Sequence, residues 1–467
     1  MTTTVTPTEL RARFAVILSD LYGREVPAYQ TLVEVAHAVN ADVATALGDA
    51  AERLGSLERV TAERHGAIRV GSPREMAQVA RVFGAMGMHP TGFYDLRDAS
   101  ASSVPVISTA FRPIEGEELA ANPFRVFTSL LATTDRRFFT ADLSARLQRF
   151  LAARELFAPR LLVLADRAVA DGGLGSADAE EFLTLAAQSF ALSTEPIDRA
   201  WYAELEQVSA VAADIGGVAS THINHLTPRV LDIDDLYARM SARGITMIDA
   251  IQGPPRWAGA DVLLRQTSFR ALAEPRRFRE PDGTVGEGSL RVRFGEVEAR
   301  GVALTPAGRA RYDQAVAEVD ADRSQDAAQV WARHFPTGEA ELFADDLAVC
   351  TVTAVDRPRD GQRPAGSVPE LLRDGWLRAE PVVYEDFLPR SAAGIFQSNL
   401  TDAGSKDATE EGALLDADYL AGVLERPLHD PFDLYRAQHE ASVETALARL
   451  GLPPATTARF GTRNPQD

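Results

Sequence analysis

The chain has 467 residues and a formal net charge of −19 at pH 7, with Cys350 as its single cysteine. An acidic chain of this kind excludes nucleic acid and anionic membrane as partners, because both require a clustered basic face. One cysteine excludes an internal disulfide and any cysteine-based zinc or iron–sulfur site, so Cys350 is predicted to be a small core residue in a reducing compartment.

The first ten residues, MTTTVTPTEL, lack the basic and apolar regions of a secretory signal. No apolar run reaches the roughly 18 residues that a membrane-spanning helix needs. Together these features predict a cytoplasmic protein without a membrane partner. The length allows several domains or one large elaborated domain, at roughly 100–200 residues per domain.

Residues 1–60 are predicted to form N-terminal helices. Thr8 can cap the first helix, whose apolar residues recur at helical spacing until Gly23 ends it. A second helix is predicted to follow at about residues 28–54.

Residues 61–115 are predicted to form a strand–helix–strand–strand module. An extended segment runs through His65 to Val70, and Ser72 and Glu75 then have the spacing of a capping box around Pro73. Two segments after the helix have strand character, PTGFYDL and VPVISTAFR.

The pattern over residues 116–215 is helical and predicts an insertion, after which the earlier order returns in residues 216–305. There an extended stretch through His225 precedes a helix capped by Asp234, and three strands follow. In both copies the histidine lies on the first strand, within ten residues of the predicted cap. This similarity of organisation, without residue identity, predicts a degenerate repeat.

Three segments lie towards the C-terminus. Residues 306–378 have a helical pattern, and residues 379–450 are predicted to contain the strand PVVYEDFLP, the small-residue loop SAAGIFQSNL and C-terminal helices. Residues 451–467 are predicted to be a disordered tail.

Three short segments carry the residues suited to metal chemistry, RHGAIRVG around His65, THINHLTPR around His225 and RFGEVEARG around Glu296. Two imidazoles and one carboxylate are the ligand set that holds non-haem Fe(II) and leaves coordination positions open. The segments therefore indicate a metal-dependent oxygenase.

Spacing alone leaves alternatives open within these segments. His222 and His225 on one strand point to opposite faces, so only one of them can contact the metal directly. Glu296 and Glu298 share a face, and either could reach it. The planar forks of three arginines also suit a substrate carboxylate, although each could equally form a surface ion pair: Arg69, Arg265 and Arg390.

Several longer strings resemble the 2-oxoadipate dioxygenase/decarboxylase family, also called 2-hydroxyglutarate synthases. They follow one another in order between about residues 8 and 450: ERHGAIRVG, MGMHPTGFYDL, HINHLTPR, LLRQTSF, RFGEVEARG and VYEDFLPRSAAGIFQSNL. The resemblance implies an α+β fold with a vicinal-oxygen-chelate-like core, in which paired βαβββ modules surround a metal. Large helical insertions and a C-terminal helical region would complete this fold.

The resemblance also implies the roles of individual residues. Its iron ligands fall on His65, His225 and Glu296, and its carboxylate-binding arginine falls on Arg69. Substrate contacts are expected from His65, Arg69 and the loop residues Arg390 and Ser391, although the family has a small aliphatic residue where this chain has Arg390. Three residues are expected to support the ligands from behind: His222, Glu298 and Gln266.

The implied reaction uses Fe(II), O2 and a 2-oxo diacid. For 2-oxoadipate, decarboxylation and hydroxylation give 2-hydroxyglutarate and CO2, a step of lysine breakdown in this family. Two other classes of protein fit the same ligands. One is a glyoxalase-type isomerase or metal hydrolase, and the other is a chelate-fold protein that binds an acid without turnover.

Overall fold

The repeated order predicted from the sequence forms the centre of the fold. The computed structural model describes residues 4–53, 55–98, 104–356, 363–390, 394, 395, 399 and 406–454. The first module consists of strand β2 (Arg64–Val70), helix α4 (Pro73–Gly84) and strands β3 (His89–Asp95), β4 (Val106–Arg112) and β5 (Arg125–Leu131). The predicted capping box of Ser72 and Glu75 is present and fixes the turn from β2 into α4.

The second module repeats this order. It consists of strand β8 (His225–Pro228), helix α11 (Ile233–Ala242) and strands β9 (Leu264–Ser268) and β12 (Glu296–Arg300). Gln252 forms an antiparallel bridge to Gln266 in β9, and Met247 forms one to Phe269, the residue after β9. The segment that contains Met247 and Gln252 therefore takes the place of the module's second strand. The cap of α11 is Asp232 and not the predicted Asp234, because the Asp232 side chain accepts from the first free backbone amides.

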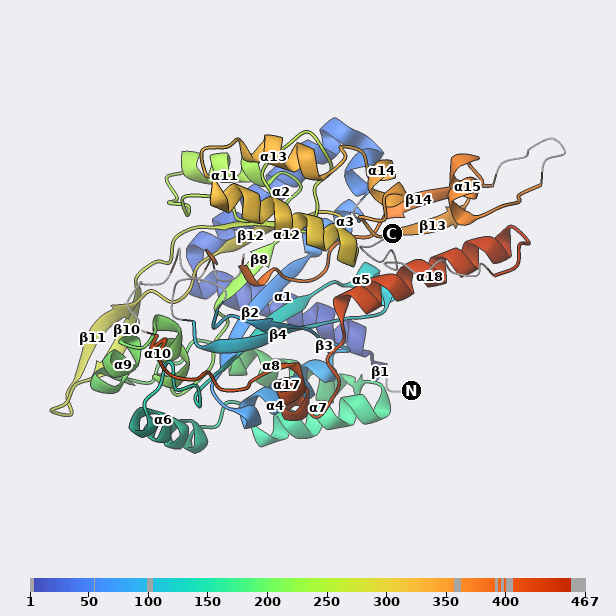
Figure 1. The fold of residues 1–467 in the computed structure, drawn as a ribbon. Helices are drawn as coiled ribbons and strands as arrows, with labels where there is room; N and C mark the ends of the chain where they lie inside the picture. Colours follow the sequence, from blue (N-terminus) through green and yellow to red (C-terminus); the bar gives the residue numbers. More distant parts are fainter. Residues whose placement is uncertain are drawn as a thin grey trace.

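The two modules meet through their first strands (Figure 1). The order of the main sheet is β3-β4-β5-β2-β8, with β2 and β8 antiparallel, and β9 and β12 form a separate antiparallel pair. A parallel bridge between Arg229 and Glu298 connects the end of β8 to β12. In each module the first strand therefore lies parallel to the last, and the expected α+β fold with paired βαβββ modules is confirmed.

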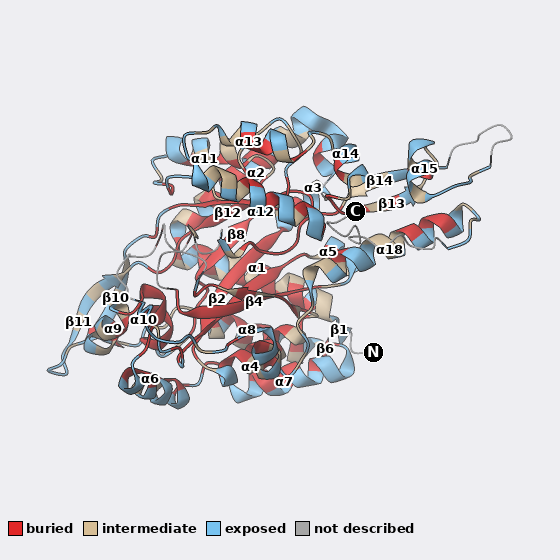
Figure 2. Ribbon diagram, viewed as in Figure 1, coloured by how far each residue is buried: buried red, intermediate tan, exposed pale blue. Residues whose placement is uncertain are grey.

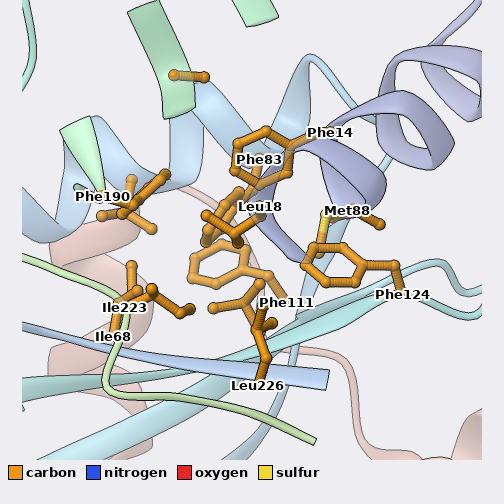
Figure 3. Packing of buried hydrophobic residues seen from close by; sticks show 14 of the residues in the cluster. Phe14, Leu18, Ile68, Phe83, Met88, Phe111, Phe124, Phe190, Ile223 and Leu226 are labelled. Carbon is orange, nitrogen blue, oxygen red and sulfur yellow. The ribbon is translucent and has the colours of Figure 1, made fainter. Parts of the chain in front are cut away.

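One face of this sheet packs against helices and the other faces the interior between the modules. Figure 3 shows Ile68 and Leu226 packed with Phe14 and Leu18 of helix α1 (Pro7–Glu25) and with Phe83 of α4. Because side chains alternate along a strand, the residues next to Ile68 and Leu226 point to the opposite face. The catalytic candidates lie on that second face.

The N-terminal region is helical, as predicted, but the bounds of its helices differ. The first helix continues past Gly23 to Glu25, and the second ends at Leu47 and not near residue 54. The elements are β1 (Thr4–Val5), α1, α2 (Pro27–Leu47), the 3₁₀ helix η1 (Gly48–Glu52) and α3 (Leu57–Ala62). Thr6, and not Thr8, caps α1, because Thr6 and Glu9 form a complete capping box that places Pro7 at the first helical position.

The predicted helical insertion at residues 116–215 contains three strands that the sequence pattern did not separate, of which β5 is the longest. Strand β5 is buried at every position, so it lacks the alternation that marks a half-exposed strand. The remaining elements of this region are α5 (Gly116–Ala121), α6 (Ala141–Ala153), α7 (Pro159–Asp171), β6 (Leu174–Gly175), α8 (Ser176–Ser189), β7 (Ile197–Asp198), α9 (Arg199–Glu206) and α10 (Ala210–Gly216). Strand β7 pairs with β10 of the hairpin β10 (Glu274–Arg279) and β11 (Val285–Leu290), which precedes β12.

The C-terminal region combines helices with one further strand pair. Its elements are α12 (Pro306–Ala321), α13 (Ala327–His334), α14 (Glu339–Ala344), β13 (Cys350–Ala354), α15 (Val368–Arg373), β14 (Leu377–Pro381), α17 (Ala417–Leu424) and α18 (Pro431–Arg449). The pair β13–β14, with α15 and α18, extends away from the main sheet and is largely exposed at its outer surface (Figure 2).

The strand and the loop predicted for residues 381–400 are only partly seen in the structure. The predicted strand PVVYEDFLP overlaps β14 only at Pro381, although Val383 also bridges to Val302. Most of the loop SAAGIFQSNL and residues 455–467 of the predicted tail lie outside the described residues. Within the described ranges, no helix is both long enough and apolar enough to cross a bilayer.

Candidate metal centre

The three predicted ligands lie together between the modules. His65 is the second residue of β2, and His225 and Glu296 are the first residues of β8 and β12. One donor atom of each lies within 4.8 Å of the others, and all three residues are buried. Nε2 of His65 is 3.4 Å from Oε1 of Glu296, and Nδ1 of His225 is 3.5 Å from Oε2 of the same carboxylate.

Strand register brings these side chains to one place. His65 pairs with Thr227 across the β2–β8 boundary, and His225 pairs with Ala67. Because Arg229 bridges to Glu298 in parallel, Glu296 lies beside Thr227, two residues earlier. All three ligands therefore occupy neighbouring positions on one face of the sheet.

The donor atoms suit a divalent metal ion. Both ring nitrogens of His225 are buried, and neither has a hydrogen-bond partner among the described residues. Burial lowers the pKa of His225, and burial raises the pKa of Glu296 against the opposing effect of His65. Buried polar atoms without partners are costly, and a divalent ion would satisfy them. Two imidazoles and a carboxylate thus fit the predicted ion and leave further coordination positions for small molecules.

Glu298 orients His65. Nδ1 of His65 lies 2.9 Å from Oε2 of Glu298, which leaves Nε2 directed towards Glu296. Arg300 binds Glu298 at 2.7 and 2.8 Å, and Arg125 binds it at 3.3 Å. Burial alone would raise the pKa of Glu298, but Arg300 and His65 lower it to about 2. The ionised carboxylate lies beside Nδ1 at contact distance, which favours a proton on that nitrogen and leaves Nε2 available as a ligand atom.

A buried cluster of charges continues behind Glu298. Glu63 lies 2.7 Å from Arg125, 2.9 Å from Arg229 and 3.6 Å from Arg300. Glu385 also contacts Arg125, and the Glu63 carboxylate is fully buried. Each charge in the cluster is matched by a charge of opposite sign, so the network can remain ionised in the interior.

Glu298→Gln is expected to weaken metal binding about 10–100-fold without removing it, the usual scale for a residue that orients a ligand. Glutamine keeps the shape of the side chain but not the charge that fixes the proton on His65. Equilibrium dialysis against a metal buffer measures the change. Glu380→Gln, a substitution at a glutamate of β14 whose side chain is 45% exposed, is the control and should leave affinity unchanged.

The other walls of the site are polar on one side and aromatic on the other. Gln266 donates a hydrogen bond from Nε2 to Oε1 of Glu296, as expected of a residue that supports a ligand. The Phe387 ring lies 5.0 Å from the His65 ring, and the Phe294 ring lies 5.2 Å from the His225 ring. The aromatic rings limit access of water to the ligands, so electrostatic interactions in the site are strengthened.

Arg69 lies on the same face of β2 as His65, and its guanidinium is held by Asp214 of α10. Asp214 also lies 3.3 Å from Nε2 of His222 and accepts a hydrogen bond from Asn224 at 3.0 Å. Burial alone would raise the pKa of Asp214, but His222 and Arg69 hold it well below its usual value. All four side chains are buried, so Arg69 is a cation fixed in position beside the triad.

Not every predicted residue joins this site. His222 contacts Asp214 and Asn224, one step removed from the ligands. Arg265 binds Asp234 at 2.7 Å. The side chain of Arg390 is 60% exposed and pairs with Asp320 of α12, and Ser391 lies outside the described residues.

Asp214 and Glu63 were missed by the sequence reasoning. Asp214 follows four apolar or small residues in the stretch SAVAADIGG, and a lone carboxylate in so apolar a helix is a signal of a buried partner. Glu63 stands at the turn between a helix and a strand, where a solvated glutamate is common. Apart from Arg59, four residues earlier, its partners lie on β5, just after β8 and on β12, so a local pattern shows at most one of its contacts.

The fold and site define an α+β protein of the vicinal-oxygen-chelate type, with a buried group of two imidazoles and one carboxylate between its two modules that could hold a metal ion. The chain belongs to the 2-oxoadipate dioxygenase/decarboxylase family, whose model matches residues 14–399. This confirms the resemblance noted in the sequence.

Individual relatives are similar over nearly their whole length. A protein of Mycobacterium tuberculosis named 2-oxoadipate dioxygenase/decarboxylase is 59% identical over 429 residues, which are 92% of this chain and 96% of that protein. A protein of the same name from Pseudomonas putida is 39% identical, covering 96% of this chain and 98% of its own. The crystal structure of the hydroxyglutarate synthase from Pseudomonas putida in complex with 2-oxoadipate is 37% identical, with a TM-score of 0.83, and covers 96% and 99% of the two chains.

Proposed function

We propose that this protein is a non-haem Fe(II) dioxygenase that converts 2-oxoadipate and O2 into 2-hydroxyglutarate and CO2, a step of lysine breakdown. The buried triad of His65, His225 and Glu296 carries the proposal, together with membership of the family. The equation balances, because the six-carbon acid loses C1 as CO2 and the remaining five carbons gain both atoms of O2. No external reductant is required, since the substrate supplies the electrons.

When bound, Fe(II) would supply open coordination positions for the 2-oxo acid and for O2. His65, His225 and Glu296 would hold it, and the chain's other residues would fix their geometry. Glu298 keeps the Nδ1 proton on His65, and Gln266 restrains one oxygen of Glu296. The Phe387 and Phe294 rings keep water from the reacting end of the acid.

Arg69 would bind the distal carboxylate of the substrate. It lies four residues beyond His65 on the same face of β2, which is roughly 13 Å along a strand. The long side chain can span part of this distance back towards the triad. An unpaired carboxylate in a buried site costs several kcal/mol, and a guanidinium fork is the group best suited to neutralise it. Asp214 would hold the fork in one orientation.

Arg390 and Ser391 would contact the substrate from the loop that follows Phe387. Because the Arg390 guanidinium is directed to Asp320, its contact would be made through the backbone. Residues 384–387, which precede this loop, are anchored by Arg300, whose guanidinium donates to the backbone oxygens of Tyr384 and Asp386 at 2.7 and 3.0 Å. A fixed base of this kind would let the loop approach the substrate in a defined position.

Labelling with 18O2 tests the reaction class. The Fe(II)-loaded protein and 2-oxoadipate should give 2-hydroxyglutarate with one labelled atom in the new carboxylate and one in the hydroxyl, as read by mass spectrometry. Exchange with water can dilute the hydroxyl label, so the carboxylate label decides. A product without oxygen from the gas would support the glyoxalase-type isomerase or hydrolase class, and binding without product would support an acid-binding protein.

A further inference from the structure

The two modules can be compared residue by residue, because their helix caps fix the alignment. Ser72 caps α4 and lies seven residues after His65, and Asp232 caps α11 and lies seven residues after His225. His65 and His225 therefore hold equivalent positions in the two modules. The equivalence does not depend on their chemistry, since the caps are set by helix geometry alone.

The same alignment carries over to the last strand of each module. Four residues after the histidine, Arg69 pairs with Ser129 of β5, and Arg229 pairs with Glu298 of β12, in both cases in parallel. Glu298 and Ser129 are thus equivalent. Two residues earlier on the same strands, the equivalent of the ligand Glu296 is Phe127.

The alignment also identifies the residues that flank these positions on the third strand of each module. Ser129 pairs with Ser108 of β4 and Phe127 pairs with Ala110. In the second module, Glu298 pairs with Gln266 of β9 and Glu296 pairs with Ser268.

Phe127 faces the triad as Glu296 does. Ala67 pairs with Phe127 on one side and with His225 on the other, so only a small side chain stands between them. Thr227 stands in the same relation between His65 and Glu296. The Phe127 ring lies 5.1 Å from the Phe387 ring, which in turn lies 5.0 Å from His65.

We propose that Phe127 occupies the place of a fourth protein ligand and keeps that side of the metal open for the substrate. A carboxylate or imidazole there would take one of the three positions that a triad leaves open on a six-coordinate ion, and would leave too few for a chelating 2-oxo acid together with O2. A phenyl ring has no lone pair to donate, excludes water and offers a flat apolar wall to the chelating end of a 2-oxo acid. The substrate part of this proposal rests on the proposed function; the part concerning the metal does not.

The test compares Phe127→Glu with Phe127→Gln, two side chains of the same length that differ in the carboxylate. Mn(II) is the probe, and its dissociation constant is measured by equilibrium dialysis. Water proton relaxation reports how much water still exchanges at the bound ion. Phe127→Glu is expected to bind Mn(II) about tenfold more tightly than Phe127→Gln, because affinity rises with the number of charged ligands. Its relaxation enhancement should be lower, since the new carboxylate displaces water.

Addition of 2-oxoadipate gives a second measurement of water proton relaxation. In the wild type, 2-oxoadipate should lower the relaxation enhancement by displacing water, and Phe127→Glu should need a higher concentration of the acid for its response than Phe127→Gln, because the new carboxylate takes one of the open positions and adds a negative charge. If the Glu and Gln variants have the same Mn(II) affinity and the same relaxation, the role assigned to Phe127 is overturned. Circular dichroism checks folding, and Phe127→His offers an imidazole in the same place if the Glu variant does not fold.

The experiment distinguishes failure of the proposed function from failure of the role proposed for Phe127. Should 2-oxoadipate leave the relaxation of the wild-type protein unchanged, the proposed substrate is wrong, while the Mn(II) affinities of the variants still decide what Phe127 does.

Discussion

Alanine in place of His65, His225 or Glu296 is expected to abolish both metal binding and O2 consumption. The three residues supply all the donor atoms of the candidate centre, and the site is buried, so water can replace a missing ligand only poorly. The loss of metal binding should be complete, whereas Glu298→Gln is expected only to weaken metal binding. Metal content of the purified variants and an oxygen electrode with 2-oxoadipate measure the two effects.

His222→Ala is the matched control for His225→Ala. Both remove a buried imidazole from the same short segment, but His222 contacts Asp214 and Asn224 and not the triad. The control should keep its metal, with activity reduced only to the extent that Arg69 loses its support. If His222→Ala loses the metal and His225→Ala retains it, the ligand assignment is wrong.

Arg69→Lys is expected to weaken binding of the diacid by up to about 2–5 kcal/mol, the range measured when one partner of a buried charge pair is truncated. Lysine keeps the positive charge but lacks the planar fork that can serve Asp214 and a substrate carboxylate at once. The deficit should therefore appear chiefly in KM. Steady-state kinetics with 2-oxoadipate and with 2-oxohexanoate, which has no distal carboxylate, separate this effect from damage to the triad.

The wild-type protein should have a much higher kcat/KM for 2-oxoadipate than for 2-oxohexanoate. Arg69→Lys should reduce this difference, because it lowers kcat/KM for the diacid and not for the monoacid. Arg390→Val is a useful comparison, because the Arg390 guanidinium is exposed and paired with Asp320. It should leave the preference intact. Equal kcat/KM for the two acids in the wild-type protein would contradict a diacid substrate and leave a 2-oxo-acid oxygenase of another specificity.

Local signals were sufficient to predict the repeated modules and the histidine strands. The capping box of Ser72 and Glu75 marks the start of α4, and in both modules the histidine precedes the predicted helix cap by fewer than ten residues, although the second cap is Asp232 and not the predicted Asp234. Signals of this kind depend on neighbours along the chain, so they survive without knowledge of tertiary contacts.

Residues whose roles depend on partners far along the chain could not be resolved in this way. Glu296 and Glu298 share a strand face, and only the register of β12 against β8 shows that the first meets the histidine nitrogens while the second lies behind His65. The resemblance to a family, and not spacing, separated them. Strand β5 was hidden for a related reason, because a strand buried on both faces has no periodicity of its own.

The charged cluster behind the centre makes the two modules unlike and mutually dependent. Glu63, just before β2, binds Arg229 of the second module, yet the residue equivalent to Glu63 in that module is the apolar Ile223. Arg125 of β5 likewise reaches across to Glu298 of β12. Two copies of the first module would keep the pair of Glu63 and Arg125 but would lack their partners Arg229, Glu298 and Arg300, and two copies of the second would lack Glu63. The halves of this fold are therefore complementary and cannot be exchanged for one another, in spite of their common architecture.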